Sequence, residues 1–358
     1  MKFLNLIYGM VGDLIIRYLP NFNKNKNYFV FIAHPRDLKD ATNKFFFLRF
    51  LPKPILLLFL KHMWPVRASE ITGFKDSNGK LIKGYFIVIS ILPEQILKNK
   101  KHAVKKIIQA VKLAEKKGAN IVGLGALTSS ITDGGKDLIG KVNVNLTTGN
   151  TLTSYVTFLD VQNIAKAKGI DLNKEIIAIV GATGLIGSVV SRLIVRNYTA
   201  KLILVGRTIS HIELLKKEIS EIRKDNNVEI TNSIDKISSA KIVIVATSSS
   251  SAFIHSKHLK QGAIIYDITQ PRNVSSEVLK ERNDLIMIDG GLIRIPEARI
   301  NFNVGLPKGV FFSCLVETMI LSVEKEFNKL SLGHIDLAGI DFIKNKFNKY
   351  KFELYNKF

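Results

Sequence analysis

A glycine-rich turn at the end of a short apolar strand constrains the fold of this chain most. The segment EIIAIVGATGLIG (175–187) puts Gly181, Gly184 and Gly187 between a run of β-branched residues and the start of a helix pattern. Glycine at these points permits a tight turn, close approach of the backbone to a pyrophosphate, and close packing of helix on strand. The order G-x-x-G-x-x-G is a variant of the commoner G-x-G-x-x-G, so the turn predicts a dinucleotide site without choosing the cofactor.

The chain after this turn alternates strands and helices over short connections, which is typical of a parallel, doubly wound sheet. Further strands are predicted at 201–207, 228–231, 241–248, 263–269 and 285–291, and helices at about 184–197, 209–223 and 313–330. Residues 1–150 mix a strand at 28–35, a hairpin at 69–91 around Ser77-Asn78-Gly79, a helix at 101–117, and strands at 120–127 and 142–150.

The predicted fold class is therefore α/β. It combines a C-terminal doubly wound parallel Rossmann sheet with an N-terminal mixed α/β domain, closed by C-terminal helices. The predicted boundaries are 1–150 for the mixed domain, 151–173 for a connecting helix, 174–310 for the Rossmann domain and 311–358 for the C-terminal helices. A content of 46% hydrophobic and 23% charged residues excludes a disordered or collagen-like chain.

The end of the second strand of the Rossmann domain indicates the cofactor. Sites for NAD usually hold the ribose 2′-OH there with Asp or Glu, whereas Gly206-Arg207-Thr208 offers a cation and a hydroxyl that suit a 2′-phosphate. A strand-end arginine that contacts only solvent is the alternative. We expect Thr247 and Ser248, after the fourth strand, to line the same crevice. The predicted cofactor is NADPH, held by Gly181, Ala182, Thr183, Gly184, Leu185, Ile186, Gly187, Arg207, Thr208, Thr247 and Ser248.

The single cysteine, Cys314, excludes an intramolecular disulfide and indicates an intracellular protein. It follows Ser313, a candidate N-cap, at the predicted start of a helix, and Lys308 is close in sequence. The positive end of the helix dipole and that lysine favour a thiolate, which is the nucleophile needed to attack an acyl thioester. On the residues alone, however, a lone cysteine in an apolar helix is more often a buried core residue than a nucleophile.

The net charge of +22 comes from 52 Lys and Arg against 30 Asp and Glu, and part of the lysine excess fits biased codon usage. Residues 1–150 contain 24 basic and 9 acidic residues, so most of the positive charge lies there and an acidic partner is expected to dock there. Seven scattered histidines and one cysteine give no metal-ligand spacing, so no metal is predicted.

Two apolar stretches are candidates for membrane segments. Gly9, Gly12 and Asp13 interrupt the start of the chain, which predicts no secretory signal. The stretch 45–66 contains three basic residues and two prolines, so it is too broken to span a bilayer as one helix. Three interpretations of this stretch are possible: a buried pair of helices, an interfacial segment with basic flanks, or the wall of a site for an apolar ligand.

Five segments in order resemble the long-chain acyl-(acyl carrier protein) reductase family: LTTGNTLTSYV (146–156), IVGATGLIGS (179–188), YDITQPRNV (266–274), IDGG (288–291) and FFSCLVETMIL (311–321). The likeness runs from about residue 30 to about 325, and residues 1–27 and 291–310 depart from it. It implies an NADPH-dependent reduction of a fatty acyl thioester, on acyl carrier protein or coenzyme A, to a fatty aldehyde.

The same resemblance implies roles for residues and partners. Cys314 falls on the position of the cysteine that is acylated first, residues 1–150 become the substrate and acyl-binding domain, and acidic acyl carrier protein becomes the expected partner. Thr147, Thr148 and Asn150 are candidates for orienting substrate or nicotinamide, or else form a turn at the end of a strand. The expected location is cytoplasmic, with peripheral contact at the inner membrane surface.

Three other functions compete. A dehydrogenase of a small free metabolite, like the shikimate or amino-acid dehydrogenases, would not need Cys314. An acyl-tRNA reductase would use the basic charge for RNA but would need a cysteine in its N-terminal half, so no nucleic acid is expected. A non-catalytic NADP-binding protein could dock on membranes through its greasy basic segment and basic tail.

Overall fold

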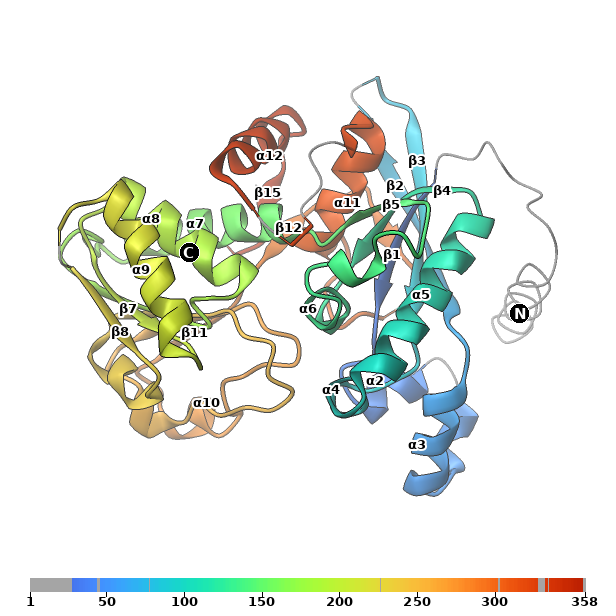
Figure 1. Cartoon of the computed structure of the whole chain (residues 1–358), viewed down its shortest axis with the longest axis horizontal. Coiled ribbons are helices and arrows are strands. Elements are labelled where there is room, and N and C mark those ends of the chain that lie inside the picture. Colours follow the sequence, from blue (N-terminus) through green and yellow to red (C-terminus); the bar gives the residue numbers. More distant parts are fainter. Residues whose placement is uncertain are drawn as a thin grey trace. The chain divides into compact units, whose positions relative to one another are not determined.

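The structure, a computed structural model, describes residues 28–43, 46–76, 78–225, 227–301, 303–327, 332–333 and 335–356. The chain forms two compact units, drawn in Figure 1. The first unit comprises Met1–Gly149, Ile293–His334 and Asn345–Glu353, and the second Asn150–Leu292, Ile335–Lys344 and Leu354–Phe358. The predictions made for residues 1–27, for Ser77 and for 328–330 lie outside the described residues.

A six-stranded mixed sheet in the order β13-β2-β3-β1-β4-β5 forms the centre of the first unit. β1 pairs parallel with β3 and β4, and β4 with β5, whereas β2 pairs antiparallel with β3 and β13. The bounds are β1 Tyr28–Ala33, β2 Val66–Lys75, β3 Leu81–Val88, β4 Ala119–Leu124, β5 Asn145–Thr147 and β13 Arg299–Ile300. The predicted hairpin is thus β2 and β3, with Gly79 at a positive φ of 78° in the turn between them.

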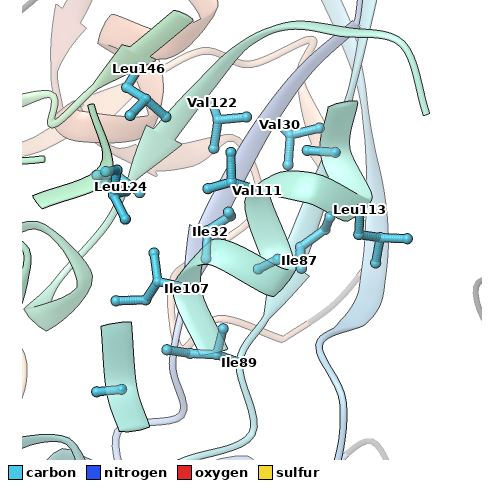
Figure 2. Packing of buried hydrophobic residues seen from close by; sticks show 14 of the residues in the cluster. Val30, Ile32, Ile87, Ile89, Ile107, Val111, Leu113, Val122, Leu124 and Leu146 are labelled. Atoms are coloured by element: carbon cyan, nitrogen blue, oxygen red, sulfur yellow. The ribbon is translucent and has the colours of Figure 1, made fainter. Parts of the chain in front are cut away.

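Helix α5 (Lys100–Lys116) covers one face of this sheet. Successive strand residues point to opposite faces, so one set of alternate positions forms a buried cluster with the apolar stripe of the helix. Figure 2 shows that cluster, with Ile107 and Val111 of α5 among Val30, Ile32, Ile87, Val122 and Leu124 of the strands.

Helix α11 (Ser313–Glu324) packs against β1 and β4, on the strand residues that point away from α5. A Cβ atom on Gly123 of β4 would lie 2.0 Å from Thr318 Oγ1, so glycine is required for this close approach. Gly123 alternates with Val122, which belongs to the α5 cluster. The helix that carries Cys314 is therefore part of the first unit, on the face of its sheet opposite α5.

The second unit contains a parallel sheet in the order β11-β10-β9-β6-β7-β8, the 3-2-1-4-5-6 order of a Rossmann fold. The four inner strands, β10, β9, β6 and β7, are short and almost wholly buried, as expected for a sheet covered on both faces, whereas the edge strands β11 and β8 are partly exposed. Their bounds are β6 Ile176–Val180, β7 Lys201–Val205, β8 Val228–Thr231, β9 Ile242–Val245, β10 Ile264–Asp267 and β11 Ile286–Asp289. The helices are α7 Asn150–Ala167, α8 Leu185–Asn197, α9 Ile209–Ile222 and α10 Val278–Glu281. The predicted α/β fold class is confirmed.

In the described part of the apolar stretch 45–66, Pro52 separates a 3₁₀ turn at Phe46–Phe50 from α3 at Lys53–His62. Leu48, Leu56 and Leu60 are buried beneath them. Within the described ranges, no helix has the length and apolar character needed to cross a membrane. The remaining elements are α2 Leu38–Asn43, α4 Pro93–Lys98, α6 Leu127–Ile131, α12 Leu337–Lys349, and a third sheet of β14 Val310–Phe312, β12 Leu292–Arg294 and β15 Glu353–Leu354.

Two segments differ from their predicted form. The strand expected at 142–150 is only β5, because Gly149 takes a positive φ of 69° and α7 begins at Asn150. Residues 293–310, which we assigned by sequence to the Rossmann domain, belong to the first unit, because β13 pairs with β2.

Candidate functional site

The predicted dinucleotide turn of the second unit joins β6 to α8. Gly181 has a φ of 85°, and a Cβ atom on it would lie 2.4 Å from the carbonyl oxygen of Ala246. A Cβ on Gly187 would lie 2.3 Å from the carbonyl oxygen of Gly181, so only glycine allows this approach of turn and helix. Gly184 is the N-cap of α8 and offers no side chain to its first N–H groups. These donors suit a pyrophosphate, so the turn fits a dinucleotide.

Arg207 and Thr208 follow β7, and both side chains are exposed. Thr208 is the N-cap of α9, but its hydroxyl makes no capping hydrogen bond. Both side chains therefore extend from the strand end where a ribose 2′-phosphate is expected. Their contact with cofactor stays a prediction.

A buried polar network holds the loop that follows β9. The Thr247 hydroxyl donates to Asn273 Oδ1 and accepts from the Ser249 N–H, while Ser248 is exposed. The Asn273 side chain also donates to the Ser249 carbonyl at 3.2 Å, and its own N–H donates to Asp267 Oδ2 at 3.1 Å. Thr247 thus anchors the loop through Asn273, a role that we did not foresee from the YDITQPRNV motif.

Cys314, in the first unit, lies in the first turn of α11 and is half-buried. The predicted N-cap was wrong: the capping residue is Phe312, at the end of β14, and Ser313 is already the first helical residue. Gly149 packs directly on the cysteine, since a Cβ on Gly149 would lie 2.2 Å from Cys314 Cα and 2.4 Å from Cys314 Cβ. The LTTGN segment and the lone cysteine are thus in contact, and glycine is what permits it.

The thiol is harder to ionise than we predicted. Burial raises the pKa of Cys314 to about 12, and the carboxylate of Glu317 adds to the rise. The N–H groups of Leu315 and Cys314 lower the pKa, as the helix-end argument expects, but by less than burial raises it. The expectation of an easily formed thiolate is therefore corrected. Lys308, which we expected to assist, is exposed.

Glu317, one helical turn after Cys314, is the functional candidate that we missed in the sequence. It is buried, and its Oε1 accepts a hydrogen bond of 2.7 Å from the Thr147 hydroxyl. An acidic residue inside the apolar run LVETMIL was the available signal, because buried carboxylates are rare without a role or a partner. The contact ties the predicted Thr147 to the helix that carries the cysteine.

Thr148, Asn150 and the buried His34 have structural surroundings. Thr148 and Asn150 are buried, and the Asn150 carbonyl accepts from Ser154 in the first turn of α7. His34 uses both ring nitrogens: Nε2 accepts from the Leu127 N–H, so Nδ1 carries the proton and donates to the Pro35 carbonyl. Burial lowers the pKa of His34 to about 4. This histidine is neutral and structural.

The chain is similar to several known proteins. Residues 163–290 match the family model described as Shikimate / quinate 5-dehydrogenase. The aminotransferase PigE of a Serratia species is 25% identical over 341 residues, and the chain spans 39% of its length. The long-chain acyl-(acyl-carrier-protein) reductase of Synechococcus elongatus is 30% identical over 287 residues, 75% of this chain and 81% of that protein. The nucleotide-binding domain of glutamyl-tRNA reductase from Thermoplasma volcanium is 22% identical, with a TM-score of 0.28 over 37% of this chain and 86% of that one.

The glycine turn, the strand order and the matched family model define an NAD(P)-dependent oxidoreductase of the Rossmann class. Its dinucleotide-binding domain is an NADP-binding one, which confirms the predicted cofactor, NADPH. At 30% identity over most of the Synechococcus protein, the chain belongs to the long-chain acyl-(acyl-carrier-protein) reductase family. Among the described residues, no group of three or more His, Cys, Asp and Glu side chains could hold a metal ion.

Proposed function

We propose that this chain reduces a long-chain fatty acyl thioester, carried on acyl carrier protein or coenzyme A, to a fatty aldehyde with NADPH. The observation that carries the proposal is Cys314 in the first turn of α11, packed on Gly149 and one turn from the buried Glu317. Membership of the reductase family supports the same substrate class.

The first step forms an acyl-enzyme. Because the pKa of the Cys314 thiol is about 12, the thiol is protonated at neutral pH and needs a base. Residues i and i+3 of a helix share a face, so Glu317 is the nearest candidate, and Thr147 fixes its carboxylate. Glu317 takes the thiol proton, the sulfur bonds to the acyl carbon, and the bond from that carbon to the carrier sulfur breaks. The carrier leaves as a thiol with the proton from Glu317.

The second step releases the aldehyde. NADPH, when held at the glycine turn of residues 181–187, would supply a hydride to the acyl carbon. The Cys314 sulfur then leaves that carbon and takes up one proton, which restores the thiol and frees the aldehyde. Backbone N–H groups in the first turn of α11 are suited to hold the acyl oxygen, which becomes negative in the tetrahedral intermediate of each step. Thr148 and Asn150 remain candidates for orienting substrate or nicotinamide.

Acidic acyl carrier protein is the proposed partner, because residues 1–150 contain 24 basic and 9 acidic residues. Added salt screens such docking. Raising the ionic strength should increase KM for the carrier-bound substrate and leave KM for NADPH nearly unchanged. Equal changes in the two constants would contradict electrostatic docking by this unit.

Intact-mass measurement tests the chemistry directly. Purified protein incubated with palmitoyl carrier protein or palmitoyl coenzyme A should gain one acyl group, and added NADPH should remove it as aldehyde. Cys314→Ala should gain none. Glu317→Gln keeps an acceptor for Thr147 but no proton acceptor, so it should acylate far more slowly while binding NADPH normally. Absence of any adduct with every chain length would refute the proposal.

A dehydrogenase of a small free metabolite is the second candidate. It is favoured by the Shikimate / quinate 5-dehydrogenase match, which spans residues 163–290 and thus the cofactor-binding sheet. Turnover of a free hydroxy or amino acid that survives in Cys314→Ala would favour this second candidate. A protein that binds NADPH and turns over neither class would instead be a non-catalytic NADP-binding protein.

A further inference from the structure

Helix α3 presents an exposed apolar face that the proposed chemistry does not use. Ile55, Leu58 and Phe59 recur at helical spacing and are 53%, 59% and 42% exposed, and Phe50, just before the helix, is 81% exposed. Soluble surfaces carry scattered apolar residues, but a cluster of four large ones on one short segment is unusual and marks an interaction site. Figure 1 shows α3 in blue, low in the first unit.

The helix is held firmly on its other side. Leu56 and Leu60 are buried in the cluster beneath it. At its C-terminal end, the buried Lys106 of α5 donates to the carbonyls of His62 and Met63, at 3.0 and 2.6 Å. Its exposed face is therefore a built surface on an anchored helix rather than a frayed end.

The sequence around this apolar face is basic. Residues 41–69 contain Lys44, Arg49, Lys53, Lys61 and Arg67 and no Asp or Glu. Arg49 and Lys53 are exposed before the apolar face, and Lys61 follows it, half-buried. Aliphatic and phenylalanine side chains bordered by cations suit the boundary between lipid headgroups and acyl chains.

From this pattern we infer that α3 and the preceding turn dock on the surface of a bilayer that contains anionic lipid. The apolar side chains enter the acyl boundary, and the cations lie at the level of the headgroup phosphates. The acidity of a carrier protein matches only the cations, whereas an anionic bilayer matches the cations and the four large apolar side chains together, so the bilayer is the better match. The inference does not depend on the reaction proposed for Cys314.

Flotation with vesicles tests it, using the full chain with phosphatidylcholine vesicles and with vesicles that contain about a third phosphatidylglycerol. The chain should float with the anionic vesicles. Ile55→Glu with Leu58→Glu should weaken partitioning about a hundredfold, roughly tenfold for each apolar side chain. The matched control is Ile139→Glu with Leu214→Glu, which adds the same charge at equally exposed apolar positions and should float like the wild type.

Lys53→Gln with Lys61→Gln should reduce the preference for anionic vesicles about fivefold for each lysine. Cys314→Ala should bind vesicles normally, so failure of docking and failure of catalysis are distinguishable. A wild type that does not float, or a control pair that loses binding equally, would overturn the inference. So would capture of unacylated acyl carrier protein by this face without vesicle binding, or a dimer that the Ile55 and Leu58 changes dissociate.

Discussion

Alkylation of the lone cysteine measures whether burial or the helix N-terminus controls its ionisation. A pKa of about 12 in place of the ordinary 9.0 lowers the thiolate fraction below pH 9 about a thousandfold. The rate of iodoacetamide reaction, followed by intact mass, should therefore rise about tenfold per pH unit from pH 7 to pH 10.5 without a plateau. Because Cys314 is the only cysteine in the sequence, the signal comes from one thiol.

Two comparisons isolate the cause. The same chain unfolded in urea should titrate near the ordinary value, since the desolvation is then lost. Glu317→Gln removes the carboxylate that adds to the rise, so its profile should shift to lower pH than that of the wild type. A wild-type plateau below pH 9 would refute the reasoning, because the N–H groups at the start of α11 would then outweigh burial.

Three further predictions concern the second unit. In a fluorescence titration, Arg207→Ala should weaken the binding of NADPH about tenfold and leave the binding of NADH unchanged, with Arg196→Ala, also at an exposed arginine, as the control. Equal losses of affinity for the two cofactors would show that Arg207 does not contact the 2′-phosphate. Gly187→Ala should weaken the binding of both cofactors about a hundredfold, because the added Cβ would displace the Gly181 carbonyl in the turn. Unchanged binding would contradict the close approach of helix and turn. Burial raises the pKa of Asp160 from 3.8 to about 7, so the folded state holds this proton more tightly than the unfolded chain. The free energy of unfolding should then fall by up to about 4 kcal/mol between pH 4 and pH 7, and Asp160→Asn should flatten this pH dependence in urea titrations. The same pH dependence in Asp160→Asn and the wild type would contradict the raised pKa of Asp160.

The Rossmann sheet could be predicted because its signals are local. Ile176–Val180 is a continuous buried apolar strand, and the glycines after it are required by the backbone itself, whatever the rest of the chain does. The parallel, doubly wound class then follows from the alternation of strands and helices over short connections. The matched region, 163–290, covers most of this locally encoded part.

The position of α11 could not be predicted, because it depends on contacts between distant residues. Gly123 and Thr318 are 195 positions apart, and nothing near either one shows that a helix and a strand must approach there. The contact of Gly149 with Cys314 is equally remote in sequence. A motif can show that a glycine is needed, but the partner that needs it is fixed only by the packing.

The ionisation of Cys314 failed as a prediction for a related reason, and the failure bears on the chemistry. A helix N-terminus is visible in sequence, whereas desolvation depends on every element packed around the sulfur. In the proposed reaction, the burial that makes a free thiolate costly would leave the neutral acyl thioester unpenalised, so burial would favour the acyl-enzyme over the free thiolate. Each change of charge on the sulfur must then be matched by a proton transfer nearby. The buried carboxylate of Glu317, held by Thr147, is the group that the structure offers for this proton transfer. Cys314 and Glu317 are therefore expected to act together in the proposed reaction.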